Sequence, residues 1–318
     1  MAVSAFIFPG QGSQAVGMGR DLAASFAAAR QVFEEVDEVL KQKLTKLMFE
    51  GPADELTLTE NAQPALMAVS LAVLRVLQTE GGVNLKDKIS LAAGHSLGEY
   101  SALAAVDSFS VADAAKLLKL RGQAMQKAVP PGVGAMAALL GVELELAREI
   151  CTEAQVALQG QETVAVANDN GGGQVVISGH KEAVEQAMEI AKAKGVKRAM
   201  LLPVSAPFHC ALMAPAAEAM AEAFEKTPPR PPILPIIANV TAAKVNDPLQ
   251  IRDLLVQQVT ATVRWRESID EMMKLGVTHF YEIGAGKVLS GLVKRIAPDA
   301  TATATSTPAD IEALLKVL

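Results

Sequence analysis

Two patterns of hydrophobic and polar positions alternate along the chain. Short apolar runs of strand length, such as residues 4–9 and 88–94, are separated by longer segments with helical periodicity. Residues 21–44 carry their charges on one side of the predicted helix. Residues 61–81 form another predicted helix, with a proline near its start and a glycine at its end. This alternation predicts an α/β fold, with a mostly parallel sheet covered by helices on its faces.

A smaller unit is expected after the break at residues 130–132, where the sequence reads PPG. From there the pattern is strand, helix, strand, strand, helix, strand, which is the βαββαβ order of a ferredoxin-like domain, complete in about seventy residues. We therefore predict a ferredoxin-like small domain over residues 131–203. It would be inserted into a large α/β domain formed by residues 1–130 and 204–318. The segment TATATSTP at residues 301–308 is expected to be a surface loop.

Composition narrows the class of protein. Half of the 318 residues are hydrophobic and a fifth are charged, so a large core is available and disorder is not expected. The net charge of −6 argues against a nucleic-acid-binding protein. The apolar N-terminus has no basic residues before it and is expected to be a strand rather than a signal peptide.

Two further features bear on the compartment. The apolar segment 65–77 is interrupted by Ser70 and Arg75 and is expected to be too short to span a membrane. The two cysteines, Cys151 and Cys210, cannot form a disulfide framework, which fits a reducing environment. A soluble cytoplasmic protein is therefore expected.

Ser96 lies between two glycines in the stretch GHSLGEY, which has the spacing G-x-S-x-G. An apolar run precedes it and a helix-forming run follows, as in the strand–turn–helix of a nucleophile elbow. Such a turn exposes the serine hydroxyl at the start of a helix. There the backbone N–H of Leu97 is free to stabilise an oxyanion. The alternative is a serine that only caps a helix after an ordinary turn.

A serine nucleophile needs a base, and the chain has four histidines. His209 follows a predicted strand and a proline, in the kind of loop where parallel sheets place catalytic groups. His95 adjoins Ser96 and is expected to point away from it, whereas His180 and His279 are expected to be structural. His209 is therefore the candidate base, with a packed structural histidine as the alternative. No acidic partner can be assigned, although a backbone carbonyl can also hold the required tautomer.

Six motifs occur in the order found in malonyl-CoA:acyl carrier protein transacylases: FPGQGSQ, GHSLGEYSAL, KLRGQAM, PFHCALM, QQVTATVRW and EIGAGKVLSGL. The resemblance covers essentially the whole chain. It implies an α/β-hydrolase-like large domain with a ferredoxin-like insert, in agreement with the pattern above. It also implies transfer of a malonyl group from malonyl-CoA to the phosphopantetheine thiol of acyl carrier protein, in fatty acid biosynthesis.

The resemblance implies a ping-pong reaction with roles for particular residues. Ser96 resembles the acylated nucleophile, and His209 resembles its general base and acid. The backbone N–H groups of Leu97 and Gln11 resemble the oxyanion hole. No metal or redox cofactor is implied, because CoA and the carrier's pantetheine are substrates.

Two more positions match the family. Arg121 resembles the arginine that binds the malonyl carboxylate, although an arginine on a helix is more often solvated. Gln258 resembles the glutamine whose backbone carbonyl orients the histidine. A main-chain oxygen would then replace the missing acid, and an extra buried carboxylate is not expected because it would repel the malonyl carboxylate. Phe208, before the histidine, resembles malonyl-selective acyltransferases, since a bulky ring would crowd an α-methyl branch.

Other interpretations stay open. GQGSQA at residues 10–15 satisfies a dinucleotide-binding pattern, but the following segment is a long helix rather than a strand ending in an acid, so a nucleotide site is rejected. Asn168 and Asn170 could line a cleft between domains or belong to a simple turn. The chain could also be a serine thioesterase or hydrolase, an inactive carrier-binding module, or a free-standing malonyl loader for a polyketide synthase.

The expected partner is an acidic acyl carrier protein, and the protein itself is expected to be a monomer. Basic clusters at residues 192–198 and around Arg264 and Arg266 are candidate docking sites. Solvated helix faces are the more common reason for such runs.

Overall fold

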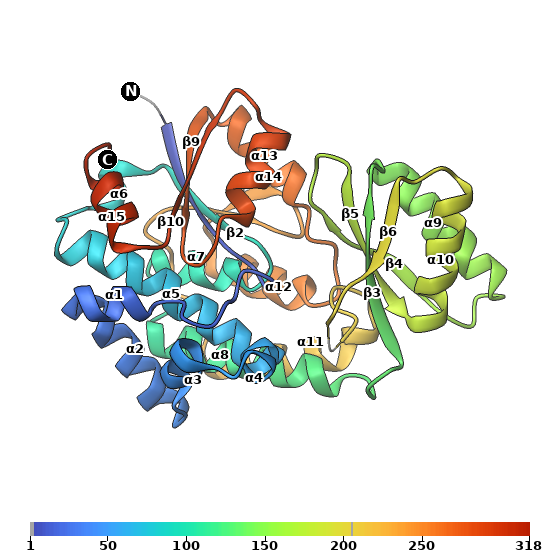
Figure 1. Cartoon of the computed structure of the whole chain (residues 1–318), viewed down its shortest axis with the longest axis horizontal. Coiled ribbons are helices and arrows are strands. Elements are labelled where there is room, and N and C mark those ends of the chain that lie inside the picture. The colour runs from blue at the N-terminus through green and yellow to red at the C-terminus, as the bar shows by residue number, and fades with distance from the viewer. Residues whose placement is uncertain (1–2, 205) are drawn as a thin grey trace.

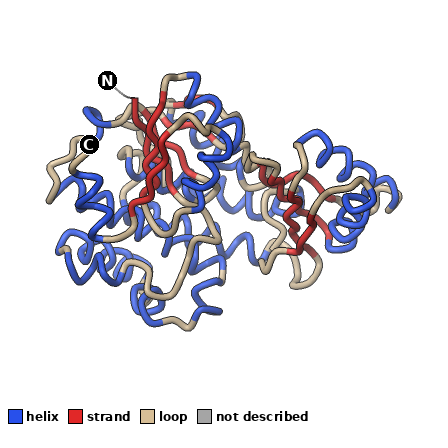
Figure 2. The backbone as a smooth tube through the Cα atoms, turned by 45° about the horizontal axis from the view of Figure 1, so that its top comes forward, coloured by secondary structure: helices blue, strands red, loops and turns tan. Residues whose placement is uncertain are grey.

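Two β-sheets organise the chain, and each has its own cover of helices (Figure 1). The computed structural model describes residues 3–204 and 206–318. Figure 2 shows a larger lobe, which holds both termini, and a smaller lobe that protrudes from one side of it. This two-lobed arrangement agrees with the predicted fold class.

The larger sheet has six strands in the order β10-β9-β1-β2-β7-β8. Neighbouring strands are parallel except for the antiparallel pair β7–β8. Parallel strands are connected by helical crossovers, so both faces of this sheet are covered. The strands are β1 (Val3–Phe8), β2 (Leu91–Gly94), β7 (Ile236–Ala238), β8 (Ala243–Val245), β9 (Val277–Ile283) and β10 (Thr301–Thr305).

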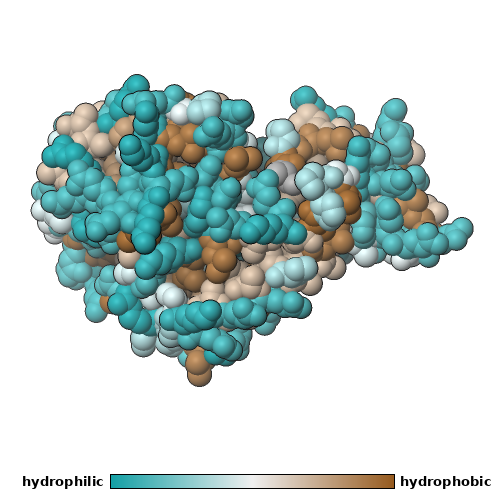
Figure 3. Space-filling view, turned by 90° about the horizontal axis from the view of Figure 1, so that it is seen from below, coloured by the Kyte–Doolittle hydropathy of each residue, from teal (hydrophilic) through white to brown (hydrophobic). Residues whose placement is uncertain are grey.

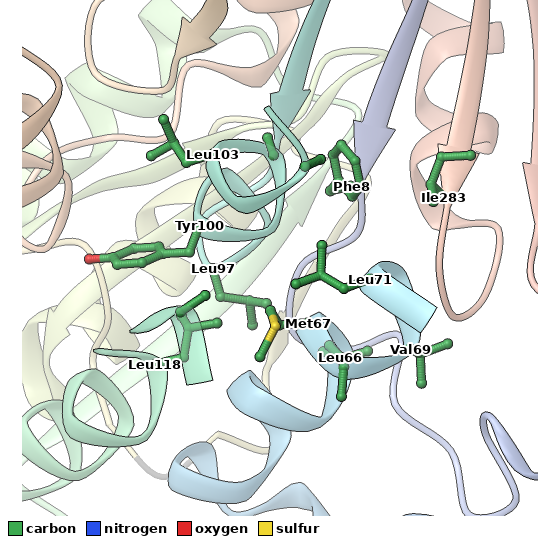
Figure 4. Close-up of a cluster of buried hydrophobic side chains, with 14 of the residues drawn as sticks. Phe8, Leu66, Met67, Val69, Leu71, Leu97, Tyr100, Leu103, Leu118 and Ile283 are labelled. Carbon is green, nitrogen blue, oxygen red and sulfur yellow. The ribbon is translucent and has the colours of Figure 1, made fainter. Parts of the chain in front are cut away.

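Strand β1 lies inside the sheet, and successive side chains enter different cores. Phe6 and Phe8 pack on one face with α5 (Thr59–Thr79), α7 (Gly98–Ala105) and α8 (Val111–Lys127), where Figure 4 shows Phe8 near Leu71 and Met67. Ala5 and Ile7 pack on the opposite face with α13 (Trp265–Lys274) and α14 (Val288–Ile296). This explains why residues 5–8 of β1 are continuously apolar rather than alternating.

The helices of the larger lobe surround the sheet. They are α1 (Arg20–Ser25), α2 (Ala27–Leu40), α3 (Leu44–Glu50), α4 (Ala53–Thr57), α5 (Thr59–Thr79), α6 (Leu85–Lys88), α7 (Gly98–Ala105), α8 (Val111–Lys127), α11 (Ala214–Lys226), α12 (Pro248–Gln258), α13 (Trp265–Lys274), α14 (Val288–Ile296) and α15 (Pro308–Leu315), with the 3₁₀ turn η1 (Ala211–Met213) before α11.

The long apolar helix α5 corrects one expectation. It spans 21 residues and is long and apolar enough to cross a membrane, since neither Ser70 nor Arg75 ends it. However, 83% of its most apolar window is buried inside the protein. The helix therefore has the length and composition of a membrane span, but its burial is that of a core helix.

Strand β10 corrects a second expectation, because residues 301–305 form an edge strand and not a loop. Ala302 and Thr305 are buried, Ala304 is half-buried, and Thr301 and Thr303 are exposed. Threonine favours strands because its branched side chain fits a pleated surface. The three threonines in residues 301–305 were therefore the signal that the loop interpretation missed.

The smaller lobe contains β3 (Gly134–Leu140), α9 (Leu144–Ala157), β4 (Val164–Asp169), β5 (Gln174–His180), α10 (Lys181–Ala193) and β6 (Arg198–Leu201). The sheet order is β4-β5-β3-β6, and all neighbours are antiparallel. The predicted βαββαβ order of a ferredoxin-like domain is confirmed. The domain limits of 131–203 stay a prediction, and residues 1, 2 and 205 of the predicted large domain lie outside the described residues.

The two faces of the small sheet have different neighbours. Ala137, Leu139 and Ile177 pack beneath α9 and α10, whereas Met136 and Val176 belong to the core that continues into the larger lobe. In the space-filling view of Figure 3, hydrophobic surface is visible where the two lobes meet. The smaller lobe therefore presents an apolar sheet face to the larger one.

Candidate active site

The sharp turn at Ser96 connects β2 to α7. Ser96 has a positive φ of 53°, an uncommon conformation for a residue with a side chain. A Cβ added to Gly94 would lie 1.9 Å from the carbonyl carbon of Gly98, and one added to Gly98 would lie 2.2 Å from the Phe8 carbonyl oxygen. Both glycines are therefore required by close backbone packing, as in a nucleophile elbow.

Ser96 is in hydrogen-bond contact with His209, whose loop lies between β6 and η1. The distance from Ser96 Oγ to His209 Nε2 is 2.8 Å, and His209 Nδ1 lies 2.8 Å from the Gln258 backbone oxygen. A carbonyl oxygen only accepts, so Nδ1 carries the proton and Nε2 accepts from the serine hydroxyl. The imidazole is thereby held in the tautomer that can remove a proton from Ser96.

His209 is buried and has a left-handed backbone conformation, with φ of 59°. Its burial, together with the positive charge of Arg121, lowers the pKa of the imidazole to about 3. The ring is therefore neutral at physiological pH. Backbone strain of this kind persists where the surroundings hold a residue in place, often at functional sites.

The other histidines lie elsewhere in the fold. His95 points away from Ser96, as expected, and its Nε2 lies 2.8 Å from Asn170 Oδ1. Its ring packs against Trp265, with 5.5 Å between the ring centroids. His180 precedes α10 and its Nδ1 accepts a hydrogen bond from a backbone N–H. His279 lies in β9, away from the site.

Arg121 is almost completely buried, with 1% of its surface exposed, so it is not the solvated helix residue of the alternative interpretation. Its Nη1 donates to Gln63 Oε1 at 2.8 Å, and its Nη2 donates to Gln258 Oε1 at 2.9 Å. The same Nη2 lies 3.2 Å from Ser96 Oγ. The Tyr100 ring lies beneath the guanidinium, 5.5 Å away, in a cation–π arrangement.

The close packing of α8 against α5 positions Arg121. A Cβ added to Gly122 would lie 2.5 Å from the Cα of Glu60, so the two helices touch beside the arginine. The guanidinium Nε is buried without a hydrogen-bond partner among the described residues. A charged group held in this way, beside a serine hydroxyl, is suited to bind a carboxylate bidentately.

The side-chain amide of Gln258 joins several parts of the site. Its Nε2 donates to the Ser96 carbonyl oxygen at 3.0 Å and to Glu99 Oε2 at 2.8 Å. Asn239 completes the support of the elbow, since its Oδ1 accepts from the Ser96 N–H and its Nδ2 donates to the Gly94 carbonyl. The nucleophile turn is thus fixed by one side chain directly after β7 and one from α12.

Glu99 and Asn239 were missed by the sequence analysis. The expectation that no extra buried carboxylate lies near the site is wrong, because Glu99 is 1% exposed and lies one amide away from Arg121. Burial raises the pKa of its carboxyl group to about 7. Both residues had a signal: Glu99 lies in the first turn after the elbow, and Asn239 directly follows a strand at the carboxyl edge of the sheet.

Gln11 and Leu97 have the free backbone N–H groups that the prediction requires. Among the described residues, neither N–H has a hydrogen-bond partner. A Cβ on Gly10 would lie 2.8 Å from the His95 carbonyl oxygen, so the loop after β1 closely approaches the elbow. The geometry is compatible with an oxyanion hole, and that role stays a prediction.

A cleft of about 440 Å³ lies between the lobes, and Ser96, Arg121 and His209 line it. Asn168 and Asn170 also line this cleft, which confirms one of the two interpretations of these asparagines. Apolar side chains form much of the remaining wall, including Met125, Met136, Val176, Leu202 and Phe208. The cleft can therefore hold an acyl chain with one buried polar end.

The basic cluster around Arg264 and Arg266 is occupied by ion pairs within the chain. Arg264 pairs with Glu267, and Arg266 contacts Asp169 at 2.9 Å and Asp270 at 3.2 Å. Asp169 belongs to the smaller lobe, so the Arg266 pair helps to fix the lobes together. These two arginines are engaged. In the other predicted docking cluster, residues 192–198, Lys194 pairs with Glu153 at 2.7 Å, whereas Lys192, Lys197 and Arg198 are exposed.

The comparisons agree with this geometry. Residues 5–308 match the model of the acyl transferase domain family. The chain belongs to this acyl transferase family. It is 46% identical to the malonyl CoA-acyl carrier protein transacylase of Escherichia coli strain K12, over the full length of both chains.

Solved structures of family members have the same fold. The acyl-carrier-protein-S-malonyltransferase of Bartonella henselae is 56% identical and superposes with a TM-score of 0.96, covering 99% of each chain. A malonyl-transacylase in complex with its type II polyketide acyl carrier protein is 43% identical, with a TM-score of 0.95 and full coverage of both chains. The two-lobed α/β architecture is therefore that of malonyl transacylases within the acyl transferase family.

Proposed function

We propose that this enzyme transfers a malonyl group from malonyl-CoA to the phosphopantetheine thiol of acyl carrier protein, by a ping-pong reaction. The observation that carries the proposal is the contact of one hydroxyl with two groups. Ser96 Oγ lies 2.8 Å from the neutral imidazole of His209 and 3.2 Å from the guanidinium of Arg121. A nucleophile, its base and a carboxylate receptor thus converge on one atom.

In the first half-reaction, His209 Nε2 removes the proton from Ser96 Oγ as the oxygen attacks the thioester carbonyl. The negative charge that develops on the carbonyl oxygen is stabilised by the N–H groups of Leu97 and Gln11. Each such donor is typically worth about 10²–10³ in rate. The C–S bond then breaks, and the CoA thiolate takes the proton from the imidazolium.

The second half-reaction reverses these steps with a new thiol. The phosphopantetheine thiol gives its proton to His209 and attacks the malonyl-Ser96 ester. The ester C–O bond breaks, and Ser96 regains its proton from the imidazolium. The Gln258 carbonyl stabilises the charged ring in both halves, because it accepts the Nδ1 hydrogen bond throughout.

Arg121 accounts for the choice of a dicarboxylic acyl group. Two charge-assisted hydrogen bonds to the malonyl carboxylate are worth about 3–6 kcal/mol, or roughly 10²- to 10⁴-fold preference over acetyl. Phe208 lines the same cleft, which supports crowding of an α-methyl branch. We place the enzyme in the cytoplasm as a monomer that needs neither metal nor redox cofactor.

Fatty acid biosynthesis is the proposed pathway, in line with the Escherichia coli relative. The similarity to a transacylase bound to a type II polyketide carrier favours loading of a polyketide carrier as a second candidate. Both use the same chemistry at Ser96, so they differ only in the carrier that is recognised. The exposed cluster at residues 192–198 is our proposed contact with an acidic carrier.

The test is mass spectrometry of the intact protein after brief mixing with malonyl-CoA alone. We expect a gain of one malonyl group on the Ser96 peptide and its discharge when a carrier with phosphopantetheine is added. Ser96→Ala should give no adduct. Ser13→Ala, which changes another serine lining the cleft, should behave like the wild type.

Two other outcomes would contradict the proposal. Rapid loss of the adduct to water without carrier would identify a hydrolase. No adduct in a folded protein would identify a carrier-binding module without activity.

A further inference from the structure

The charge of Arg121 is buried without a carboxylate in direct contact. Among the described residues, its hydrogen-bond acceptors are the neutral oxygens of Gln63, Gln258 and Ser96, and it forms no ion pair within 4.0 Å. An isolated buried cation is strongly unfavourable unless a counter-charge lies nearby. The empty site should therefore contain a compensating anion beyond this first set of neighbours.

Glu99 has the position that such an anion requires. It is 1% exposed, and its Oε2 accepts hydrogen bonds from Gln258 Nε2 at 2.8 Å and from the Asn239 N–H at 3.1 Å. The Gln258 amide thus places its oxygen on Arg121 and its nitrogen on Glu99. Its dipole is aligned between the cation and the anion, which favours both charges.

We propose that Glu99 is the counter-ion of Arg121 in the empty site and takes up a proton from solvent when a malonyl carboxylate binds Arg121. The inference rests on the proposed function, because the malonyl group brings the second negative charge. Two carboxylates that share one cation in a buried site cannot both stay ionised without a large penalty. The proton bonds to the Glu99 carboxylate, and no other bond changes in this step.

The surrounding titratable groups leave Glu99 as the site of proton uptake. The other titratable groups of the site are Arg121 on α8 and Tyr100 on α7, which interact with Glu99, and His95 in the elbow and His209 in the loop after β6. Burial lowers the pKa of both histidines and raises that of the tyrosine, so all three stay neutral near pH 7. Burial raises the pKa of Glu99 to about 7, which allows it to exchange a proton in this range.

Proton uptake makes malonyl binding depend on pH in a definite direction. Above about pH 7, Glu99 in the empty site is increasingly ionised and must be protonated for the malonyl carboxylate to bind. The affinity for malonyl-CoA should therefore fall as the pH rises, by up to about tenfold per unit. Acetyl-CoA lacks the carboxylate, so its affinity should not follow this trend.

Isothermal titration calorimetry of Ser96→Ala can count the protons, since this variant binds donors without becoming acylated. Malonyl-CoA and acetyl-CoA are titrated at pH 7.5 in buffers of different ionisation enthalpy. Both ligands carry the same CoA phosphates, so the difference between them isolates the acyl carboxylate. We expect malonyl-CoA to take up between about 0.5 and 1 proton more than acetyl-CoA.

Adding Glu99→Gln to this variant provides the matched comparison. Glutamine keeps an oxygen that can accept from Gln258 and Asn239, but it carries no titratable charge. The proton difference between the two ligands should vanish, and malonyl affinity should become independent of pH. Glu60→Gln is the control, because Glu60 pairs with Lys119 instead, and it should keep the proton difference.

Equal proton numbers for the two ligands in Ser96→Ala would overturn the inference, and this measurement needs no change at Glu99. A proton difference that survives Glu99→Gln would also overturn it. If wild-type protein is malonylated at Ser96 while the proton numbers are equal, only this inference fails. If malonyl-CoA neither binds nor acylates, the proposed function fails as well.

Discussion

The backbone carbonyl of Gln258 lies 2.8 Å from His209 Nδ1, and the side chain of the same glutamine joins Arg121 to Glu99. The two halves of one residue thus serve different parts of the site. The carbonyl fixes the tautomer of the base, whereas the amide relays charge between the carboxylate receptor and a buried acid. A substitution of the side chain can separate these two roles.

Gln258→Ala should keep the carbonyl and remove the relay. We expect malonyl transfer to fall roughly 10- to 100-fold more than acetyl transfer, because each lost hydrogen bond to a charged group is worth about 1.5–3 kcal/mol. Steady-state rates with both donors measure this difference. Gln257→Ala, in the exposed neighbour, is the control and should change neither rate. Equal losses for the two donors would show that the side chain has no part in carboxylate recognition.

Much of this site could be predicted because its signals are local. The spacing of Gly94, Ser96 and Gly98 predicts the elbow, since close packing at both glycines is a property of that short turn. His209 was predicted as the base by elimination among the four histidines. By contrast, Gln258 carries no signal of its own, and only the resemblance to a family pointed to it.

The relations that the sequence could not predict depend on tertiary packing. Glu99 and Asn239 meet because β7 pairs with β2, and strand order is not encoded in the periodicity of either segment. Burial of Arg121 likewise depends on the contact of α8 with α5 at Gly122. From the sequence alone, a charged residue on a helix is expected to be solvated, because the position of the neighbouring helix is not known.

The low pKa of His209 predicts how acylation depends on pH. In the free enzyme the imidazole should stay neutral well below its usual pKa of 6.5, since burial and the Arg121 charge both oppose protonation. The second-order rate constant for acetylation of Ser96 should therefore show no protonation step near pH 6.5. Rapid-quench mixing with acetyl-CoA between pH 4.5 and 8, followed by mass spectrometry, measures it.

Arg121→Ala should shift the protonation of His209 to higher pH. Removal of the guanidinium charge raises the pKa of His209, so the acid loss of acetylation should appear at higher pH than in the wild type. Acetyl-CoA is the suitable donor because its recognition needs no carboxylate receptor. Arg230→Ala, in an exposed arginine outside the cleft, should leave the profile unchanged. An identical profile for Arg121→Ala would show that its charge does not act on His209.

The elbow predicts a steep cost for one added methyl group. Gly98→Ala would place a Cβ 2.2 Å from the Phe8 carbonyl oxygen, which is backbone and cannot move aside easily. We expect a loss of at least about 1–3 kcal/mol in the free energy of unfolding, the usual range for overpacking. Urea unfolding followed by circular dichroism measures it.

The matched control is Gly291→Ala in α14, where nothing lies within 4 Å of the added Cβ. Alanine there should be neutral or stabilise the protein by about 0.5–1 kcal/mol, because glycine is unfavourable inside a helix. If Gly98→Ala were as stable as the wild type, the β2–α7 turn could relax and the packing argument would be wrong.

Glu99 should make stability depend on pH in the direction opposite to an ordinary surface carboxylate. Its pKa is about 7 in the folded protein and 4.5 when unperturbed, so the folded state holds a proton that the unfolded state has lost between these values. Its contribution to stability is complete below pH 4.5 and is lost as the pH rises through 7. Glu99→Gln removes this loss, so the variant should gain about 2–3 kcal/mol relative to wild type between pH 5 and pH 8.

Urea unfolding of both proteins at pH 5 and pH 8 measures the gain, and Glu60→Gln is the control whose difference from wild type should not change in this range. The ion pair with Lys119 lowers the pKa of Glu60, so its stabilising effect is present above its unperturbed pKa and is lost in acid. Both pH values lie above the unperturbed pKa of 4.5, so Glu60→Gln should be less stable than wild type by nearly the same amount at pH 5 and at pH 8. A constant difference between Glu99→Gln and wild type would mean that Glu99 stays ionised in the folded protein throughout this range, and the buried acid would then be a permanent anion beside Arg121.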